Sequence, residues 1–94
     1  MIFDWDDTNR DHLARHNITV AEAEQVLDSY PVELLVEQHE TDGIRVRFIG
    51  ETSKGRILIL IVTWRGSAIR VITGWDAPNS SKRNFLQGRR NDHG

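Results

Sequence analysis

The 94-residue chain has no cysteine, which excludes disulfide bonds, thiolate metal sites and thiol nucleophiles. It has only two prolines, and no repeat or low-complexity tract marks a linker. No apolar run approaches the roughly 20 residues that a membrane-spanning helix needs. The first residues are acidic where a signal peptide would be basic. We therefore predict a cytoplasmic protein with no membrane partner, a single domain over residues 1–88 and a frayed polar tail over residues 89–94.

Each half of the chain is poor in charge of one sign, although the net charge is only −2. Residues 1–42 hold eleven acids against two arginines, a net charge of −9; residues 43–94 hold ten bases against three acids, a net charge of +7. Ten of the twelve bases are arginine, whose planar fork binds phosphate or carboxylate through two parallel hydrogen bonds. A basic second half indicates an anionic partner such as RNA, unless the two halves fold together and neutralise each other locally.

The first expected helix lies near the start of the chain. Residues 3–6 alternate apolar and acidic side chains, as a short edge strand does. Asp7 or Thr8 can then cap a helix that reaches His16. Asn17 tolerates the left-handed backbone with which many helices end, so we expect the helix to stop there.

A second helix follows directly. Thr19 and Glu22 have the spacing of a capping box, in which each side chain satisfies a free backbone N–H near the other. Pro31 prevents the helix from continuing. Between these limits apolar residues recur at helical spacing: Val20, Ala23, Val26, Leu27 and Tyr30. We expect Val20, Ala23, Val26 and Leu27 to pack on a sheet.

From residue 32 the pattern becomes extended. Segments rich in β-branched residues, separated by short turns, indicate an antiparallel meander over residues 32–39, 44–50, 56–64 and 68–75. Residues 57–62 do not alternate, which predicts a central strand covered on both faces. A short helix opens at residues 78–81 and ends at Gly88. The predicted fold class is α+β, with an antiparallel four- to five-stranded sheet packed by two N-terminal helices and a short C-terminal helix.

His12 and His16 lie four residues apart, a spacing at which two histidines on one helical face can bind one metal ion. Leu13 stands where a zinc protease needs its glutamate base, and no third ligand follows at a recognisable spacing. We therefore predict no metal site. Asn9, His12, Leu13 and His16 are expected to face the sheet with their polar tips hydrogen-bonded, and the alternative is an acid–base or RNA-contacting role.

Arg45 and Arg47 alternate with apolar residues, so both guanidinium groups share one face of a strand. Arg65 lies in the last tight turn, and Arg70 lies on the strand after it. Four arginines on one small sheet can form an electropositive floor for a phosphate backbone. The alternative is that each arginine pairs with an acid from the helices or simply faces solvent.

Three tryptophans are the other side chains suited to nucleic acid. Trp64 and Trp75 lie near the ends of adjacent predicted strands, and Trp5 lies near the start of the chain. An exposed tryptophan beside an arginine can stack on an unpaired base. We expect Trp5 in the core, and both roles stay open for Trp75.

Short motifs between about Phe3 and Leu86 carry a family resemblance. They are Phe3-Asp4-Trp5-Asp6, Asn9, His12-Leu13, Arg15-His16, Glu22-Ala23, Val26-Leu27, Arg47-Phe48-Ile49-Gly50, Gly55-Arg56-Ile57-Leu58, Thr63-Trp64-Arg65-Gly66 and Arg70-Val71-Ile72-Thr73. In this order and spacing they resemble the BrnT-like toxins of bacterial type II toxin–antitoxin systems, whose domain is similar to the RelE-type ribonuclease fold.

The resemblance implies an endoribonuclease that uses no metal and no cofactor. In such enzymes a ribose 2′-hydroxyl attacks the adjacent phosphorus, and basic residues stabilise the charge of the transition state. Arg65 and Arg70 match the family's basic positions around the last hairpin and would form this catalytic clamp. The candidate general bases are His12, His16 and Asp76. The residues expected to contact RNA are Arg45, Arg47, Trp75, Lys82 and Arg83.

The sequence departs from the family pattern at two positions. Trp75 replaces an arginine associated with the active cleft, and Asn17 replaces a glycine. The alternative function is therefore a non-catalytic RNA- or protein-binding module of the same fold. The partners implied are a cognate antitoxin and RNA, with ribosome association left open. DNA would be contacted only indirectly, through the antitoxin.

Overall fold

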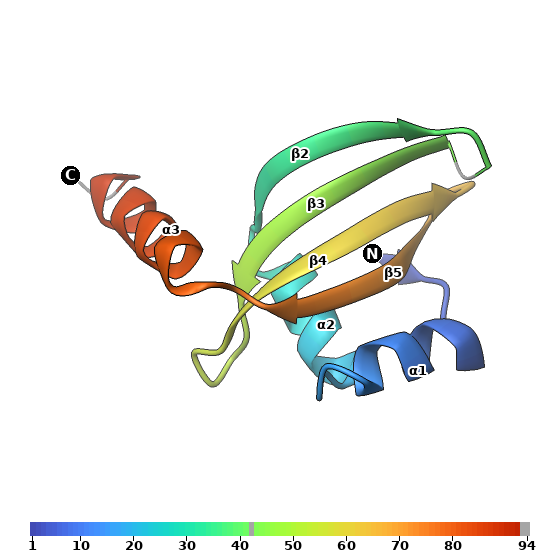
Figure 1. Cartoon of the computed structure of the whole chain (residues 1–94), viewed down its shortest axis with the longest axis horizontal. Coiled ribbons are helices and arrows are strands. Elements are labelled where there is room, and N and C mark those ends of the chain that lie inside the picture. Colours follow the sequence, from blue (N-terminus) through green and yellow to red (C-terminus); the bar gives the residue numbers. More distant parts are fainter. Residues whose placement is uncertain (42, 93–94) are drawn as a thin grey trace.

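In the described part of the chain, residues 1–41 and 43–92, three helices and one five-stranded sheet form the fold, as predicted. Side chains are described as far as residue 88 in this computed structural model. The elements are β1 (Ile2–Phe3), α1 (Asp7–Ala14), α2 (Val20–Asp28), β2 (Val32–His39), β3 (Gly43–Glu51), β4 (Ile57–Arg65), β5 (Ala68–Asp76) and α3 (Asn79–Asp92) (Figure 1). The sheet order is β1-β5-β4-β3-β2.

The predicted antiparallel meander is formed by β2 to β5. The N-terminal strand is present as an edge strand, but it pairs with β5 in a parallel sense, Ile2 beside Ala68 and Phe3 beside Ile69. The backbone N–H of Asp4 extends this pairing by donating to the carbonyl of Ile69 at 2.8 Å. As a result, the acidic N-terminal segment lies next to β5.

The central position of β4 confirms the prediction from its unbroken apolar run. Its two sets of alternate residues enter two different clusters. The cluster on the side of α1 and α2 is Leu13, Ile18, Ala23, Val26, Leu27, Val46, Leu58, Leu60, Val62, Ile69 and Val71. The cluster on the other side is Ile49, Ile57, Ile59, Ala77 and Phe85. Figure 1 shows α1 and α2 lying together along one face of the sheet, whereas α3 lies only at one end.

The cap of α1 differs from the prediction. Asp6, rather than Asp7 or Thr8, is the N-cap residue, because its carboxylate accepts from the N–H of Asn9 at 3.1 Å while the Asn9 side chain accepts from the N–H of Asp6 at 2.8 Å. The helix ends at Ala14 instead of reaching His16. Two tight turns follow, in which the N–H of His16 donates to the carbonyl of Leu13 and the N–H of Asn17 donates to the carbonyl of Ala14. Asn17 has the left-handed backbone expected there, with φ of 57°.

The stripe predicted on α1 is only partly correct. Asn9 and Leu13 are buried, and the Asn9 amide donates to the Asp4 carbonyl at 2.9 Å. A ring nitrogen of His12 lies 3.2 Å from the Ile72 carbonyl oxygen. His16 is exposed and follows the end of the helix, where it lines a shallow hollow together with His12, Ile72 and Thr73 of β5.

The second helix has the predicted capping box between Thr19 and Glu22. Its residues Ala23, Val26 and Leu27 are buried, whereas Val20 is half-buried and lies outside the core cluster. The helical pattern was expected to include Tyr30, but α2 ends at Asp28 and Tyr30 is 95% exposed.

The close contact between α2 and β3 depends on a glycine. A Cβ atom at Gly50 would lie 2.8 Å from Cγ1 of Val26, closer than side-chain packing allows. The space beneath the buried face of α2 therefore requires a residue without a side chain.

Trp5 packs at the rim of the core on the side of α1 and α2. It is half-buried, its ring stacks on Phe3 at 6.3 Å between centroids, and its indole Nε1 donates to a Glu24 carboxylate oxygen at 2.8 Å. The tryptophan therefore has the predicted packing role and joins the N-terminal segment to α2.

The C-terminal helix is longer than predicted. It runs through Gly88 to Asp92, because an interior glycine costs only about 1 kcal/mol relative to alanine and does not by itself end a helix. Phe85 anchors α3 on the second cluster. Of the predicted tail, residues 93 and 94 lie outside the described residues, and the domain boundary at residue 88 stays a prediction.

Replacing the fully buried Leu60 tests how strongly β4 stabilises the domain. Leu60→Ala removes apolar contacts on the helix side and leaves a cavity, so we expect the free energy of unfolding to fall by about 2–5 kcal/mol. Urea unfolding followed by tryptophan fluorescence measures this. Leu86→Ala, at a side chain that is 45% exposed, is the matched control and should change stability by at most about 0.5 kcal/mol. Equal losses would contradict the central role of β4.

Candidate nucleic-acid interface

The face of the sheet opposite α1 and α2 carries four arginines, and we call Arg45, Arg47, Arg65 and Arg70 the arginine face. The strand register aligns Arg47 of β3 with Ile61 of β4, which is aligned with Thr73 of β5. Arg70 is aligned with Thr63 of β4. Because α3 covers only the other end of this side, around Ile57 and Phe85, the arginine end is left open.

A β-bulge in β5 decides which side chains share this face. Ile61 is aligned with Thr73 and the next residue, Val62, with Val71, so Ile72 is an extra residue in β5. In a regular strand Arg70 and Trp75 would point to opposite faces, since their positions differ by an odd number. The extra residue reverses the alternation. Trp75 therefore packs on the same side as Arg70, against the cluster that contains Ile59.

Two members of the arginine face pair with acids from the N-terminal segment. Nη1 of Arg65 lies 3.4 Å and Nη1 of Arg70 lies 3.9 Å from the same Asp4 carboxylate oxygen. Nη2 of Arg70 lies 2.9 Å from an Asp6 carboxylate oxygen. The N–H of Asn9, followed by Arg70, lowers the pKa of Asp6. The two arginines thus meet at one carboxylate, and pairing with acids is confirmed for both.

Part of the hydrogen-bonding capacity of this face is unused. Arg70 is 9% exposed, and no acceptor among the described residues is within hydrogen-bond distance of its Nη1. The same holds for the buried Nε of Arg47 within the described part of the chain. Buried donors without acceptors are costly, so an incoming anion that reaches them gains binding energy.

Arg47 also contacts the tryptophan whose role was left open. Its guanidinium carbon lies 5.5 Å from the centroid of the Trp75 ring, a cation–π contact. Trp75 is half-buried and packs beside the second cluster. The tryptophan at this position therefore lies next to the arginine face rather than in the core beneath α1 and α2.

Two shallow hollows lie over the arginine face. One of about 100 Å³ is lined by Arg45, Arg47 and other residues that include Glu37 and His39. One of about 230 Å³ is lined by Arg65 and Arg70 together with Thr41, Thr63, Trp64 and Ile72. His39 was not predicted as a site residue. The sequence did contain a signal for it: His39 ends a predicted strand whose neighbour along the chain carries alternating arginines.

Asp76 and His16 lie elsewhere. Asp76 is at the end of β5 aligned with Leu58, far along the hairpin from Arg65, which is aligned with Ala68. Its carboxylate accepts two hydrogen bonds from Arg56, at 2.8 Å from Nε and 3.0 Å from Nη2. The carbonyl of His16 accepts from Arg56 as well, at 3.2 Å. The structure therefore does not bring these two candidates to the Arg65–Arg70 pair.

Arg56, which holds Asp76 and the His16 carbonyl, makes further hydrogen bonds, and its sequence context predicted no role for it. Besides Asp76, its Nη1 donates to the Glu22 carboxylate at 3.1 Å and to the carbonyl of Asn17 at 2.7 Å. Hydrogen bonds from Arg56 lower the pKa of Asp76. The N–H of Thr19 and then Arg56 lower the pKa of Glu22. The two carboxylates, Asp76 first, raise the pKa of Arg56 above its usual range.

The predicted RNA contacts on α3 are also separate from the arginine face. Lys82 is half-buried, and its charge contributes to the lowered pKa of Asp76. Arg83 is exposed. Among the residues that the structure describes, no group of three or more His, Cys, Asp or Glu side chains is arranged to hold a metal ion.

A comparison with known families identifies the family to which this chain belongs. Residues 5–81 match the model of the ribonuclease toxin BrnT of type II toxin–antitoxin systems. The match covers most of the chain, so this protein belongs to the BrnT family of ribonuclease toxins, whose type II systems pair each toxin with a cognate antitoxin. No curated protein and no solved structure matches the chain significantly. No helix in the described residues is long and apolar enough to cross a membrane.

Arg56 is expected to make stability depend on acid pH. The lowered pKa values of Glu22 and Asp76 stabilise the fold above their ordinary values, 4.5 and 3.8, and this stabilisation is lost as the pH falls through the lower values of the folded state. Arg56→Met should therefore reduce the free energy of unfolding at pH 7 by about 1–3 kcal/mol, the lower end reflecting the exposure of Asp76. Most of the difference from the unmodified protein should vanish near pH 2.

Chemical unfolding at a series of pH values between 2 and 7 measures this difference. Arg15→Met, at an exposed arginine near the end of α1, is the matched control and should leave the pH profile unchanged. A loss in Arg56→Met that is the same at every pH would contradict the ionic origin of the effect.

Proposed function

We propose that the arginine face binds RNA and cleaves it without a metal ion, and that a cognate antitoxin holds the protein inactive. The observation that carries this proposal is the convergence of four arginines on the part of the sheet that the helices leave open. Guanidinium groups suit this role because their planar forks fit phosphate oxygens. The match to ribonuclease toxins supports RNA as the anion.

The proposed reaction is an internal phosphoryl transfer. The 2′-oxygen of one ribose loses its proton and bonds to the adjacent phosphorus, and the bond to the 5′-oxygen of the next nucleotide breaks. The products are a 2′,3′-cyclic phosphate and a 5′-hydroxyl that has gained a proton. Arg65 and Arg70 would stabilise the extra negative charge on phosphorus in the transition state, while Arg45 and Arg47 hold the neighbouring phosphates.

His39 is better placed than His16 or Asp76 to act as the general base. It lines the same hollow as Arg45 and Arg47, Thr41 two residues further on lines the hollow of Arg65 and Arg70, and an imidazole nitrogen can accept a proton. Asp76 is held by two hydrogen bonds from Arg56, which makes its carboxylate a weaker base. We assign proton removal from the 2′-hydroxyl to His39 and structural roles to His16 and Asp76.

Asp4 is expected to yield to the substrate. Its contacts with Arg65 and Arg70 are long, at 3.4 and 3.9 Å, and both arginines share one of its oxygens. A phosphate can use the free Nη1 of Arg70 and compete for Arg65. Asp6, at 2.9 Å, holds the other side of the Arg70 guanidinium and fixes its orientation.

The second candidate is an RNA-binding module without catalysis. Trp75 in place of an arginine favours it, since the Arg47–Trp75 pair offers a stacking surface for an unpaired base rather than another charge. Binding and cleavage therefore have to be measured separately.

Lysine substitutions of the clamp separate these two candidates. Arg65→Lys and Arg70→Lys keep the charge but lose the fork, so cleavage should fall by about 100-fold while RNA affinity falls only a few-fold. Cleavage is measured with EDTA present and affinity by fluorescence anisotropy. Arg10→Lys, at an exposed arginine of α1, is the control and should alter neither. Equal losses of cleavage and affinity would support the binding module, and cleavage abolished by EDTA would contradict metal independence.

Histidine substitutions test the general base. His39→Gln should lower cleavage by at least about 100-fold, because a glutamine side chain cannot accept the proton of the 2′-hydroxyl. His16→Gln, at an exposed histidine off the arginine face, should retain the rate and its pH dependence. If His16→Gln is the slower variant, the assignment to His39 is wrong.

A further inference from the structure

The strand β2 is an open edge with an apolar surface. It ends the sheet, so within residues 1–41 and 43–92 no strand pairs with its outer edge. It is eight residues long, and all but His39 are exposed. Its large apolar residues are between 43% and 50% exposed: Val32, Leu34, Leu35 and Val36. Edge strands of this kind are usually shortened, covered or protected by lysine, because they pair readily with other chains.

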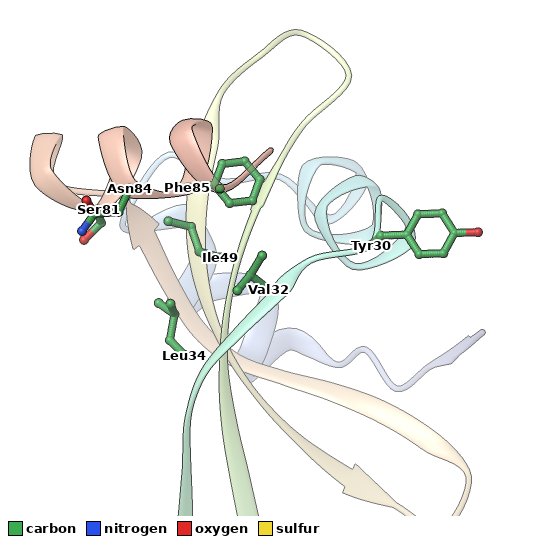
Figure 2. A pocket seen from close by; sticks show the side chains of 8 residues that line it. Tyr30, Val32, Leu34, Ile49, Ser81, Asn84 and Phe85 are labelled. Atoms are coloured by element: carbon green, nitrogen blue, oxygen red, sulfur yellow. The ribbon is translucent and has the colours of Figure 1, made fainter. Parts of the chain in front are cut away.

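A groove runs between β2 and α3 (Figure 2). It has a volume of about 420 Å³, and Val32 and Leu34 form one side with Ile49 on its floor. Figure 2 shows these side chains below Phe85 of α3. Such a groove can accept the apolar side chains of a strand that is added along β2.

The shape of β2 turns its apolar residues toward this groove. Glu33 is aligned with Phe48 and Leu35 with Arg47, so Leu34 is an extra residue that forms a bulge. Leu34 consequently lines the groove, while Leu35 lines the hollow beside Arg47. The apolar strip on β2 is continuous from the groove to the border of the arginine face.

Tyr30 stands at the mouth of the groove and points away from it (Figure 2). It is 95% exposed and has a left-handed backbone, with φ of 58°, which is unfavourable for a residue other than glycine. A fully exposed tyrosine held in this way is a typical anchor for a protein partner.

Charge indicates what kind of segment fits β2. The strand carries Glu33 and Glu37, Glu40 follows it, and no lysine or arginine occurs between Arg15 and Arg45 in the sequence. The strand register places Glu33 beside Phe48, on the side of α1 and α2, and Glu37 beside Arg45, on the arginine face. A second copy of β2 would bring more glutamates and no base to this edge, and like charges across strands are destabilising. A strand in which apolar residues alternate with lysine or arginine would fill the groove with one set of side chains and place the basic set on the side of Glu33.

We propose that β2 is the docking edge for the antitoxin, which adds an extended segment of alternating apolar and basic residues as a sixth strand. The apolar side chains enter the groove between β2 and α3, and the basic ones lie on the opposite face of the sheet, near Glu33. The inference rests on the proposed function only in taking the antitoxin as the partner. A segment in this position lies beside the arginine face and so is placed to obstruct RNA.

A synthetic peptide tests this edge directly. The probe is a capped nine-residue peptide in which valine and lysine alternate, and a peptide of alternating valine and glutamate is its counterpart. We expect the lysine peptide to shift the backbone amide resonances of residues 32–39 in the full-length protein and the glutamate peptide to bind at least about tenfold more weakly. Shifts centred on β1 or on the arginine face, or equal binding of both peptides, would overturn the proposal.

Matched variants locate the groove. Leu34→Glu should weaken binding of the lysine peptide at least about tenfold, because it places a charge among the apolar residues of the groove. Leu86→Glu makes the same change at an equally exposed leucine of α3 that does not line the groove, and should change binding by less than about twofold. Thermal unfolding of both variants confirms that each is folded. Equal effects of the two substitutions would overturn the proposal.

The state of association gives an independent outcome. If sedimentation shows a dimer that Leu34→Glu dissociates, then β2 binds a second copy of the chain and the antitoxin proposal is wrong. Peptide binding is measured without RNA, so a protein that fails to cleave RNA refutes the proposed function and leaves this result unaffected. In the same way, failure of the peptide to bind leaves the measurements on Arg65 and Arg70 standing.

Discussion

The burial of β4 on both faces is the constraint on which the rest of the structure depends. An apolar strand without alternation is stable only between two layers, and so small a domain has few residues with which to build them. The helices α1 and α2 provide most of one layer, whereas α3 provides only a small part of the other through Phe85. The uncovered remainder is where the arginines lie, so the candidate site exists because the second layer is incomplete.

Two groups of charge pairs among the described residues join the acidic and basic halves, with different consequences. Arg56 binds Glu22 and Asp76 and holds the start of α2 against the ends of the central strands. Asp4 and Asp6 instead meet Arg65 and Arg70, which leaves one guanidinium nitrogen of Arg70 without a hydrogen bond. The pairs of Arg56 have short hydrogen bonds and are suited to hold the fold together. The pairs of Arg65 and Arg70 leave a donor unused, so a phosphate can replace a carboxylate there.

Much of the architecture was predictable because it depends on local rules. Unbroken hydrophobicity over residues 57–62 required a central strand, and the Thr19–Glu22 spacing required a helix start. Asn17 adopts the left-handed backbone expected of it. The errors were local as well. Asp6, Asp7 and Thr8 can each cap a helix and compete at the start of α1, and Gly88 weakens α3 without ending it. The family resemblance is confirmed by the match over residues 5–81.

The sequence by itself therefore determined the fold class, the order of the elements and the presence of arginines on the sheet. Only the tertiary structure decided which side chains share a face, because one extra residue in a strand reverses every later side chain. Ile72 is such a residue in β5, and it places Trp75 on the side of Arg70. The partners of Arg56 lie 20 to 40 residues away along the chain, so no spacing rule reveals them. Such pairings follow from the packing of whole elements, which local pattern does not encode.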